Sequence, residues 1–395
     1  MSAGARPHPV ARLAAAVRSA APLAGALPEP PVVAAAPEDG SPWPAAAADL
    51  LARITDLSGG PRYGVGPAGT PRSVLDQVLG DHLDLAGTAA ALAATGLPDR
   101  SEVDRVVAGA AADDLLAPEA GVVVETADGA RLPAWAVGPV TGQPVLLVLP
   151  CGMPVRLVEG WVRALAVDRR VITWESRWLF ADLDSEVDLE HGVAAQVADL
   201  AAVLDAFSVP SAHVAGMCGG ALLALAAAAE LPGRVDSLSL WHGDFDLGDD
   251  APKTDHQRNL QALMGMAAQD RETAAAVHEV LLQNALAGVP ADLAHLVLYP
   301  YASRELFFRY CRLNLVVMAQ DARPYLARVD ADTLVVTSEQ DRTAHPAGSL
   351  AVAERLSAAR LHVEPDGDHL TLFRAPAHLT GLLRSRLAGT ASQVG

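Results

Sequence analysis

A cysteine stands in this sequence where a catalytic serine is common. Residues 216–220 read Gly-Met-Cys-Gly-Gly, so Cys218 occupies the centre of a Gly-x-nucleophile-x-Gly pattern. A strand pattern precedes it at 212–215, and an Ala/Leu-rich helix pattern follows it at 221–230. The glycines allow a sharp turn between the two, and the start of a helix stabilises negative charge. We therefore predict that Cys218 is a nucleophile. The alternative is a glycine-rich turn around a buried structural cysteine.

A cysteine nucleophile needs a base and an acid that orients the base. His369 follows the predicted strand at 361–363, and Asp341 follows the one at 333–337. Strand ends of this kind meet at one edge of a parallel sheet, and the chain order nucleophile, acid, histidine is typical of such sites. We predict His369 as the base and Asp341 as the acid. The alternatives are Asp244 or Asp246 for the acid and a loop role for His345 or His369, with Asp366 and Asp368 as turn residues.

An oxyanion formed at Cys218 needs backbone N–H donors. We predict Gly219, the residue after the nucleophile, as one donor. The loop after the apolar run at 145–149 supplies the other, with Met153 favoured over Cys151. Cys151 is better explained as a small apolar residue at the end of a strand.

Aromatic residues gather at 299–310, although the whole chain has only 17 Phe, Tyr and Trp. We predict that some of them line an acyl pocket, and the alternative is ordinary core packing. The candidates are Tyr299, Tyr301, Phe307 and Phe308, with Tyr310 beside them. Arg304, Arg309 and Arg312 alternate with these residues and form either a basic docking patch or a solvated helix face.

The order of the patterns predicts an α/β fold with a mostly parallel, doubly wound sheet. A hairpin at 121–137 opens it, and strands alternate with helices from 145 onward. We expect residues 1–115 to form a Pro/Ala-rich and helical extension, with an extended stretch at 22–46. Residues 116–395 form the main domain, with a helical cap inserted at about 248–325.

Composition excludes several classes of protein. The net charge of −18 disfavours nucleic acid as a partner. Three cysteines do not suggest a disulfide framework, so we expect the protein to be cytoplasmic, with its thiols reduced. Arg12 and Arg18 interrupt the N-terminal apolar stretch, so we predict no signal peptide. No run of about 18 uncharged apolar residues stands out, so we predict no membrane span. No metal-ligand spacing and no nucleotide-binding glycine loop stand out, so we predict no metal and no tightly bound cofactor.

These motifs give residues 145–373 a resemblance to the α/β-hydrolase superfamily. Two cysteine-dependent groups within it have a similar elbow. Residues 213–246 resemble the polyhydroxyalkanoate synthases, although this chain is shorter. The general layout resembles the aminoacyl-shuttling transferases of non-ribosomal peptide assembly.

The resemblance implies that Cys218 carries an acyl group as a thioester, with His369 as base and Asp341 as the orienting acid. It implies substrates on the phosphopantetheine arm of an acyl or peptidyl carrier protein, or on coenzyme A. A hydrolase acting on thioesters or lactones through the same three residues is the first alternative, and a non-catalytic binding protein is the second. The acyl group, its acceptor and the oligomeric state are not specified by the sequence.

Overall fold

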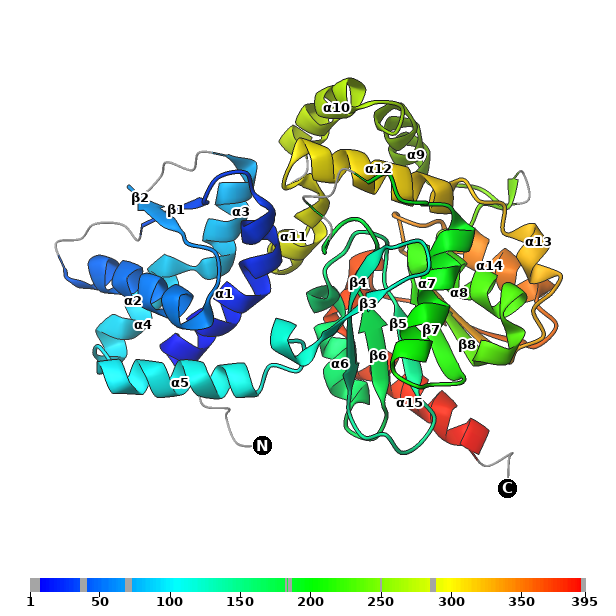
Figure 1. Cartoon of the computed structure of the whole chain (residues 1–395), viewed down its shortest axis with the longest axis horizontal. Coiled ribbons are helices and arrows are strands. Elements are labelled where there is room, and N and C mark those ends of the chain that lie inside the picture. Colours follow the sequence, from blue (N-terminus) through cyan, green and yellow to red (C-terminus); the bar gives the residue numbers. More distant parts are fainter. Residues whose placement is uncertain are drawn as a thin grey trace. The chain divides into compact units, whose positions relative to one another are not determined.

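The chain folds into two compact units (Figure 1). The computed structural model describes residues 8–35, 41–67, 73–181, 183, 187–248, 251–284 and 289–391. One unit consists of the residues up to 117 together with 278–304, and the other of 118–277 together with 305 onward. Cys218, Asp341 and His369 all lie in the second unit.

The second unit is built on an eight-stranded sheet with the order β10-β9-β8-β7-β5-β6-β4-β3. Strand β4 runs antiparallel to both of its neighbours, and all the other pairs are parallel. This arrangement confirms the predicted mostly parallel sheet that opens with a hairpin. The strands are β3 (Val122–Glu125), β4 (Arg131–Val137), β5 (Val145–Val148), β6 (Val171–Trp174), β7 (Ala212–Met217), β8 (Val235–Trp241), β9 (Thr333–Ser338) and β10 (Ala359–Glu364).

Helices cover both faces of this sheet. On one face α7 (Val193–Ala206) and α8 (Gly219–Glu230) pack on alternate strand residues, such as Leu146 and Val148 of β5. On the other face Trp161 of α6 (Glu159–Leu165) packs edge-on against Trp241 of β8, with ring centroids 4.9 Å apart. Helix α15 (Ala377–Ala391) contacts α6. The central strands β5, β6 and β7 are therefore buried on both faces, which explains the continuous apolar runs in the sequence.

The described part of the predicted cap is helical. It contains α9 (Asp255–Ala267), α10 (Arg271–Asn284), α11 (Ala291–Val297), α12 (Arg304–Met318) and α13 (Arg323–Leu326), with a short 3-10 turn, η5 (Tyr299–Tyr301). The boundary between the two compact units crosses this region, because 278–304 cluster with the N-terminal residues. The predicted domain boundaries, with one cap over 248–325, stay a prediction.

The N-terminal region is more helical than expected at its start. Helix α1 (Pro9–Ala26) continues through Pro22, and helix α2 (Trp43–Ser58) begins at Trp43, so the predicted extended stretch at 22–46 is wrong for its first five and its last four residues. A proline inside a helix costs about 3 kcal/mol, but α1 buries Leu13, Val17 and Leu23, and this packing offsets the cost. The remaining elements are β1 (Val32–Ala34), β2 (Gly64–Gly66), α3 (Val74–Leu83), α4 (Leu85–Thr95) and α5 (Arg100–Ala112).

In the described part of the chain, no helix combines the length and the apolar character that a membrane crossing needs.

The turn from β7 into α8 is sterically crowded. A Cβ atom on Gly216 would lie 2.5 Å from the Gly220 carbonyl oxygen, and one on Gly220 would lie 2.3 Å from the Val148 carbonyl oxygen. Between these glycines, Cys218 adopts φ 53° and ψ −124°, a conformation that side-chain-bearing residues rarely take. Its N–H donates to the Trp241 carbonyl at 2.9 Å, which ties the turn to β8. The predicted nucleophile therefore stands on a tight, strained turn.

The neighbouring glycines at 219 and 220 differ in the space available to them. A Cβ on Gly219 would come no closer than 3.6 Å to its surroundings, whereas one on Gly220 would collide with the end of β5. Gly220→Ala should therefore lower the free energy of unfolding by about 1–3 kcal/mol, because the collision involves backbone atoms.

The matched variant Gly219→Ala should be neutral, or should stabilise by up to about 1 kcal/mol through better helix propensity. Chemical denaturation of both variants measures the difference. Equal stabilities of the two variants would contradict this description of the turn.

Candidate active site

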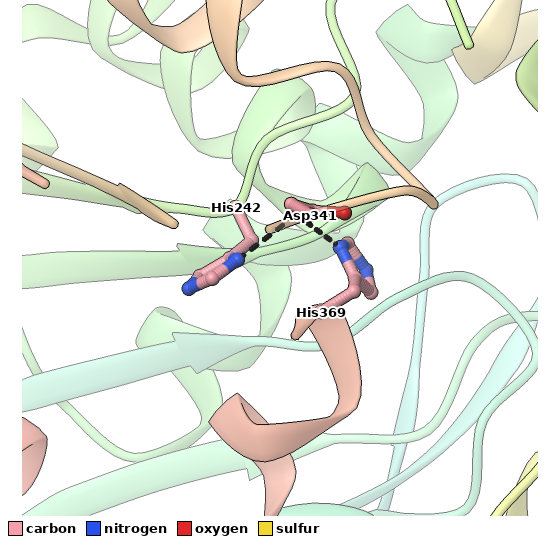
Figure 2. Close-up of side chains that lie close together, drawn as sticks. All are labelled: His242, Asp341 and His369. Atoms are coloured by element: carbon pink, nitrogen blue, oxygen red, sulfur yellow. Dashed lines mark hydrogen bonds and ion pairs between the residues drawn. The ribbon is translucent and has the colours of Figure 1, made fainter. Parts of the chain in front are cut away.

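The centre of the site is the buried carboxylate of Asp341, which accepts four hydrogen bonds. Oδ1 accepts from the backbone N–H groups of Thr343 and Ala344, each at 2.9 Å. Oδ2 accepts from Nδ1 of His369 at 2.8 Å and from Nδ1 of His242 at 3.0 Å. Figure 2 shows the carboxylate between the two rings. Burial alone would raise the pKa of Asp341, but these hydrogen bonds outweigh it and hold the pKa well below its usual value.

The ionised carboxylate fixes the proton of His369. Because a carboxylate without a proton only accepts, Nδ1 of His369 must carry a hydrogen, and Nε2 is left to accept or hold a second proton. Nε2 is buried and has no partner of regular hydrogen-bond geometry in the described chain. Cys218 nevertheless raises the pKa of the His369 ring. Burial lowers the pKa of His369, but the electrostatic effect of nearby Cys218 and the hydrogen bond to Asp341 raise it well above 6.5.

Cys218 and His369 are therefore close enough to interact, although their contact is not an aligned hydrogen bond. Cys218 is partly exposed, in contrast to Cys151 and Cys311, which are buried. Burial raises the pKa of the Cys151 thiol to about 12, so this thiol stays protonated at neutral pH.

His242 is a member of this cluster that the sequence did not assign a role. It follows β8 directly, with φ 48°, and its N–H donates to the Val336 carbonyl of β9 at 2.8 Å. Its ring lies edge-on to His369, with centroids 5.7 Å apart. One nitrogen of each histidine and an oxygen of Asp341 lie within 4.8 Å of one another, and the two shared hydrogen bonds account for that closeness without an ion.

The alternative acids and the alternative histidine have other partners. Asp244 accepts from Gln257 Nε2 at 2.6 Å, and Asp246 accepts from Lys253 Nζ at 2.6 Å. His345 caps α14 (Pro346–Arg355) through its Nδ1, which accepts from the N–H of Ala347. The geometry around His369 therefore favours Asp341 as the orienting acid.

The loop after β5 differs from the prediction in one respect. The N–H of Met153 donates to the Pro150 carbonyl at 3.2 Å, so it is already engaged in a turn. Gly152, with φ 77°, shapes this turn and donates to Ser176 Oγ at 3.0 Å. Gly219 begins α8, and the first N–H groups of a helix have no acceptor within the helix. The N–H of Gly219 is thus the better supported of the two predicted oxyanion donors. The role of Met153 stays a prediction, because its N–H could reach an oxyanion only if the turn opened or if the hydrogen were shared with the Pro150 carbonyl.

Side chains of helix α12 lie beside both the loop after β5 and the turn at Cys218. A Cβ on Gly152 would lie 2.6 Å from the Tyr310 ring, so that ring packs directly on the loop. Asn314 and Val317 are the nearest neighbours of a Cβ on Gly219, at 3.8 and 3.6 Å. The predicted Phe307 and Phe308 are buried in the same helix, and Phe308 packs under Arg271, whose guanidinium carbon lies 4.7 Å from the ring centroid.

Tyr299 and Tyr301 belong to the other compact unit. There Tyr299 is buried, and the backbone carbonyl of Tyr301 is 2.9 Å from Nε2 of His278. A role for these four aromatic residues in substrate binding stays a prediction. Tyr310, which the sequence placed in the same cluster, packs on the loop after β5.

Comparisons with known proteins agree with this architecture. The family model described as the alpha/beta hydrolase fold matches residues 165–376, more than half of the chain. An L-allo-isoleucyltransferase of Pseudomonas savastanoi pv. glycinea is 29% identical over 236 residues, which cover 57% of this chain and 79% of that protein.

Solved structures show the same fold. A hydrolase from Pseudomonas aeruginosa PA01 superposes with a TM-score of 0.54 and 23% identity, covering 67% of this chain and 97% of the other. An esterase from Exiguobacterium antarcticum superposes with the same TM-score and 18% identity, covering 68% and 99%. The family match, the strand order and the turn at Cys218 agree with one another, and the chain belongs to the α/β-hydrolase fold family.

Proposed function

We propose that this protein is a cysteine-dependent aminoacyl or acyl transferase that moves its acyl group between phosphopantetheine thioesters through a thioester on Cys218. The observation that carries the proposal is a partly exposed cysteine, held at φ 53° on the turn, that raises the pKa of a histidine hydrogen-bonded to Asp341. The relative named as an L-allo-isoleucyltransferase supports an amino acid as the acyl group.

The proposed reaction begins with His369 holding the proton of the Cys218 thiol. The thiolate attacks the carbonyl carbon of the donor thioester, and the carbonyl electron pair moves onto oxygen, where the N–H of Gly219 stabilises it. Collapse of this intermediate breaks the bond to the donor sulfur. The departing pantetheine thiolate takes the proton from His369, and Cys218 retains the acyl group.

The second half-reaction reverses these steps with an acceptor thiol. His369 takes the proton of the acceptor, whose sulfur attacks the Cys218 thioester and expels the Cys218 thiolate. A thioester is exchanged for a thioester in each half, so the transfer is nearly isoenergetic and reversible. A serine ester would be lower in energy and would favour hydrolysis. The cysteine is therefore the feature of this site that favours transfer.

The donor and acceptor in this proposal are a carrier protein, acyl or peptidyl, or coenzyme A. The phosphopantetheine arm arrives with the substrate, so the protein needs no tightly bound cofactor. Water has to be kept from the acyl-enzyme, and the side chains of α12 beside Gly219 and Gly152 are placed to do so.

The raised pKa of His369 leads to a prediction about thiol reactivity. Because Cys218 and Asp341 raise the pKa of His369, the proposal places a protonated ring beside Cys218, where it stabilises negative charge on the sulfur. His369→Gln should lower the rate of Cys218 alkylation by iodoacetamide near pH 6.5 by about 10- to 100-fold, since an ordinary thiol is about 1% ionised there.

The control is His378→Gln, which changes an exposed histidine paired with Glu364 and should leave the rate unchanged. As pH rises through the pKa of His369, the ring loses its charge and this electrostatic advantage of the wild type disappears. Equal alkylation rates for His369→Gln and wild type at low pH would count against the pair.

The fate of the acyl-enzyme separates transfer from hydrolysis. Wild-type protein loaded from an acyl-S-pantetheine should keep its acyl group in buffer and release it rapidly when free pantetheine is added. Intact-protein mass spectrometry over time, with and without the acceptor thiol, measures both rates. Loss of the acyl group to water at the rate seen with acceptor would identify a hydrolase acting through the same residues and would refute the transfer proposal.

A further inference from the structure

A second carboxylate, Asp244, lies beside the nucleophile on the loop after β8. Its N–H donates to the backbone carbonyl of Cys218 at 3.4 Å, which places the two main chains next to each other. The Asp244 side chain is partly buried and interacts electrostatically with His369. It does not hydrogen-bond to either ring nitrogen of His369, whose Nδ1 is taken by Asp341.

The partner of Asp244 is held in one orientation. Oε1 of Gln257, near the start of α9, accepts from the N–H groups of Thr254 at 2.8 Å and His345 at 3.0 Å. These two backbone donors fix the amide, so its Nε2 must face Asp244, where it donates to Oδ1 at 2.6 Å. Asp244 thus accepts its hydrogen bond from a neutral amide, and the backbone N–H groups of Thr254 and His345 hold that amide in place.

Within the described part of the chain, no cation forms an ion pair with Asp244. Lys253, the nearby ammonium group, is bound to Asp246 at 2.6 Å and to Gln261 at 3.0 Å. His256 also acts on Asp244, but desolvation and His369 lower the pKa of His256, so it is mostly neutral at neutral pH. Among the described residues, Oδ2 of Asp244 has no hydrogen-bond partner, whereas both carboxylate oxygens of Asp341 are in use. Burial raises the pKa of Asp244 by more than the hydrogen bond from Gln257 and the charges of Lys253 and His369 lower it.

We propose that Asp244, held by Gln257, is the binding site for the α-ammonium group of an aminoacyl thioester. This inference rests on the proposed function and specifies its substrate class. In an aminoacyl thioester on Cys218, the α-nitrogen is three bonds from the sulfur, and the main chains of Cys218 and Asp244 are hydrogen-bonded to each other. An ammonium group would supply the positive charge and hydrogen-bond donors that Oδ2 lacks. A simple acyl group would leave the carboxylate unpaired, so the site selects amino acids.

The test compares two donors that differ only in the α-amino group, L-valyl-S-pantetheine and isovaleryl-S-pantetheine. Wild-type protein should load the valyl group on Cys218 faster. Asp244→Asn should lower the valyl-to-isovaleryl ratio of loading rates by about 10- to 100-fold, the range for a hydrogen bond to a charged group. Asp246→Asn, on the same loop but paired with Lys253, should keep the wild-type ratio.

An unchanged melting temperature of Asp244→Asn, measured by circular dichroism, shows that the variant is folded. The wild-type ratio is a second readout that needs no variant. Wild-type loading without preference for the valyl donor, or an unchanged ratio in Asp244→Asn, overturns the ammonium site and leaves the transferase proposal standing. Failure of the wild type to load either donor overturns both.

Discussion

The site depends on how closely α8 approaches β5 and β7. The backbone oxygens of Val148 and Gly220 leave no space for side chains at Gly220 and Gly216, so the chain can turn there only through glycine. Between these two glycines, at the C-terminal end of β7, Cys218 takes a conformation with positive φ. A helix begins immediately after it, so an anion formed at this position meets unpaired N–H groups.

The second requirement is a carboxylate that stays ionised while buried. Asp341 meets it with two backbone donors on one oxygen and two imidazoles on the other. A charge inside a protein is stable only when its hydrogen bonds are satisfied, and four donors satisfy this one. His242 adds a second ring that shares the oxygen that orients His369. By fixing the proton on Nδ1 of His369, Asp341 directs Nε2 to the proposed proton exchange with Cys218.

The turn at Cys218 and the pairing of Asp341 with His369 were predictable from the sequence, and the contact of His242 with Asp341 was not. The turn at Cys218 is encoded by five consecutive residues between a strand and a helix pattern. The pairing of Asp341 with His369 follows from chain order and from the parallel register of β9 and β10, which brings the ends of both strands to one edge. His242 reaches Asp341 across 99 positions of sequence, through the pairing of β8 with β9, and no local pattern encodes that contact.

Other differences have similar physical causes. The engagement of the Met153 N–H depends on a turn closed through Gly152, whose conformation a single sequence does not specify. Helix α1 continues past Pro22 because burial of its apolar face outweighs local propensity.

The most direct test of the proposed mechanism asks which sulfur carries the acyl group. The chain has three cysteines, and two of them are buried. After incubation with an acyl-S-pantetheine, proteolysis at low pH and mass spectrometry of the peptides locates the thioester. We expect the added mass on the peptide containing Cys218 and its loss in Cys218→Ala. Acylation of Cys151 or Cys311, or labelling that persists in Cys218→Ala, would contradict the mechanism.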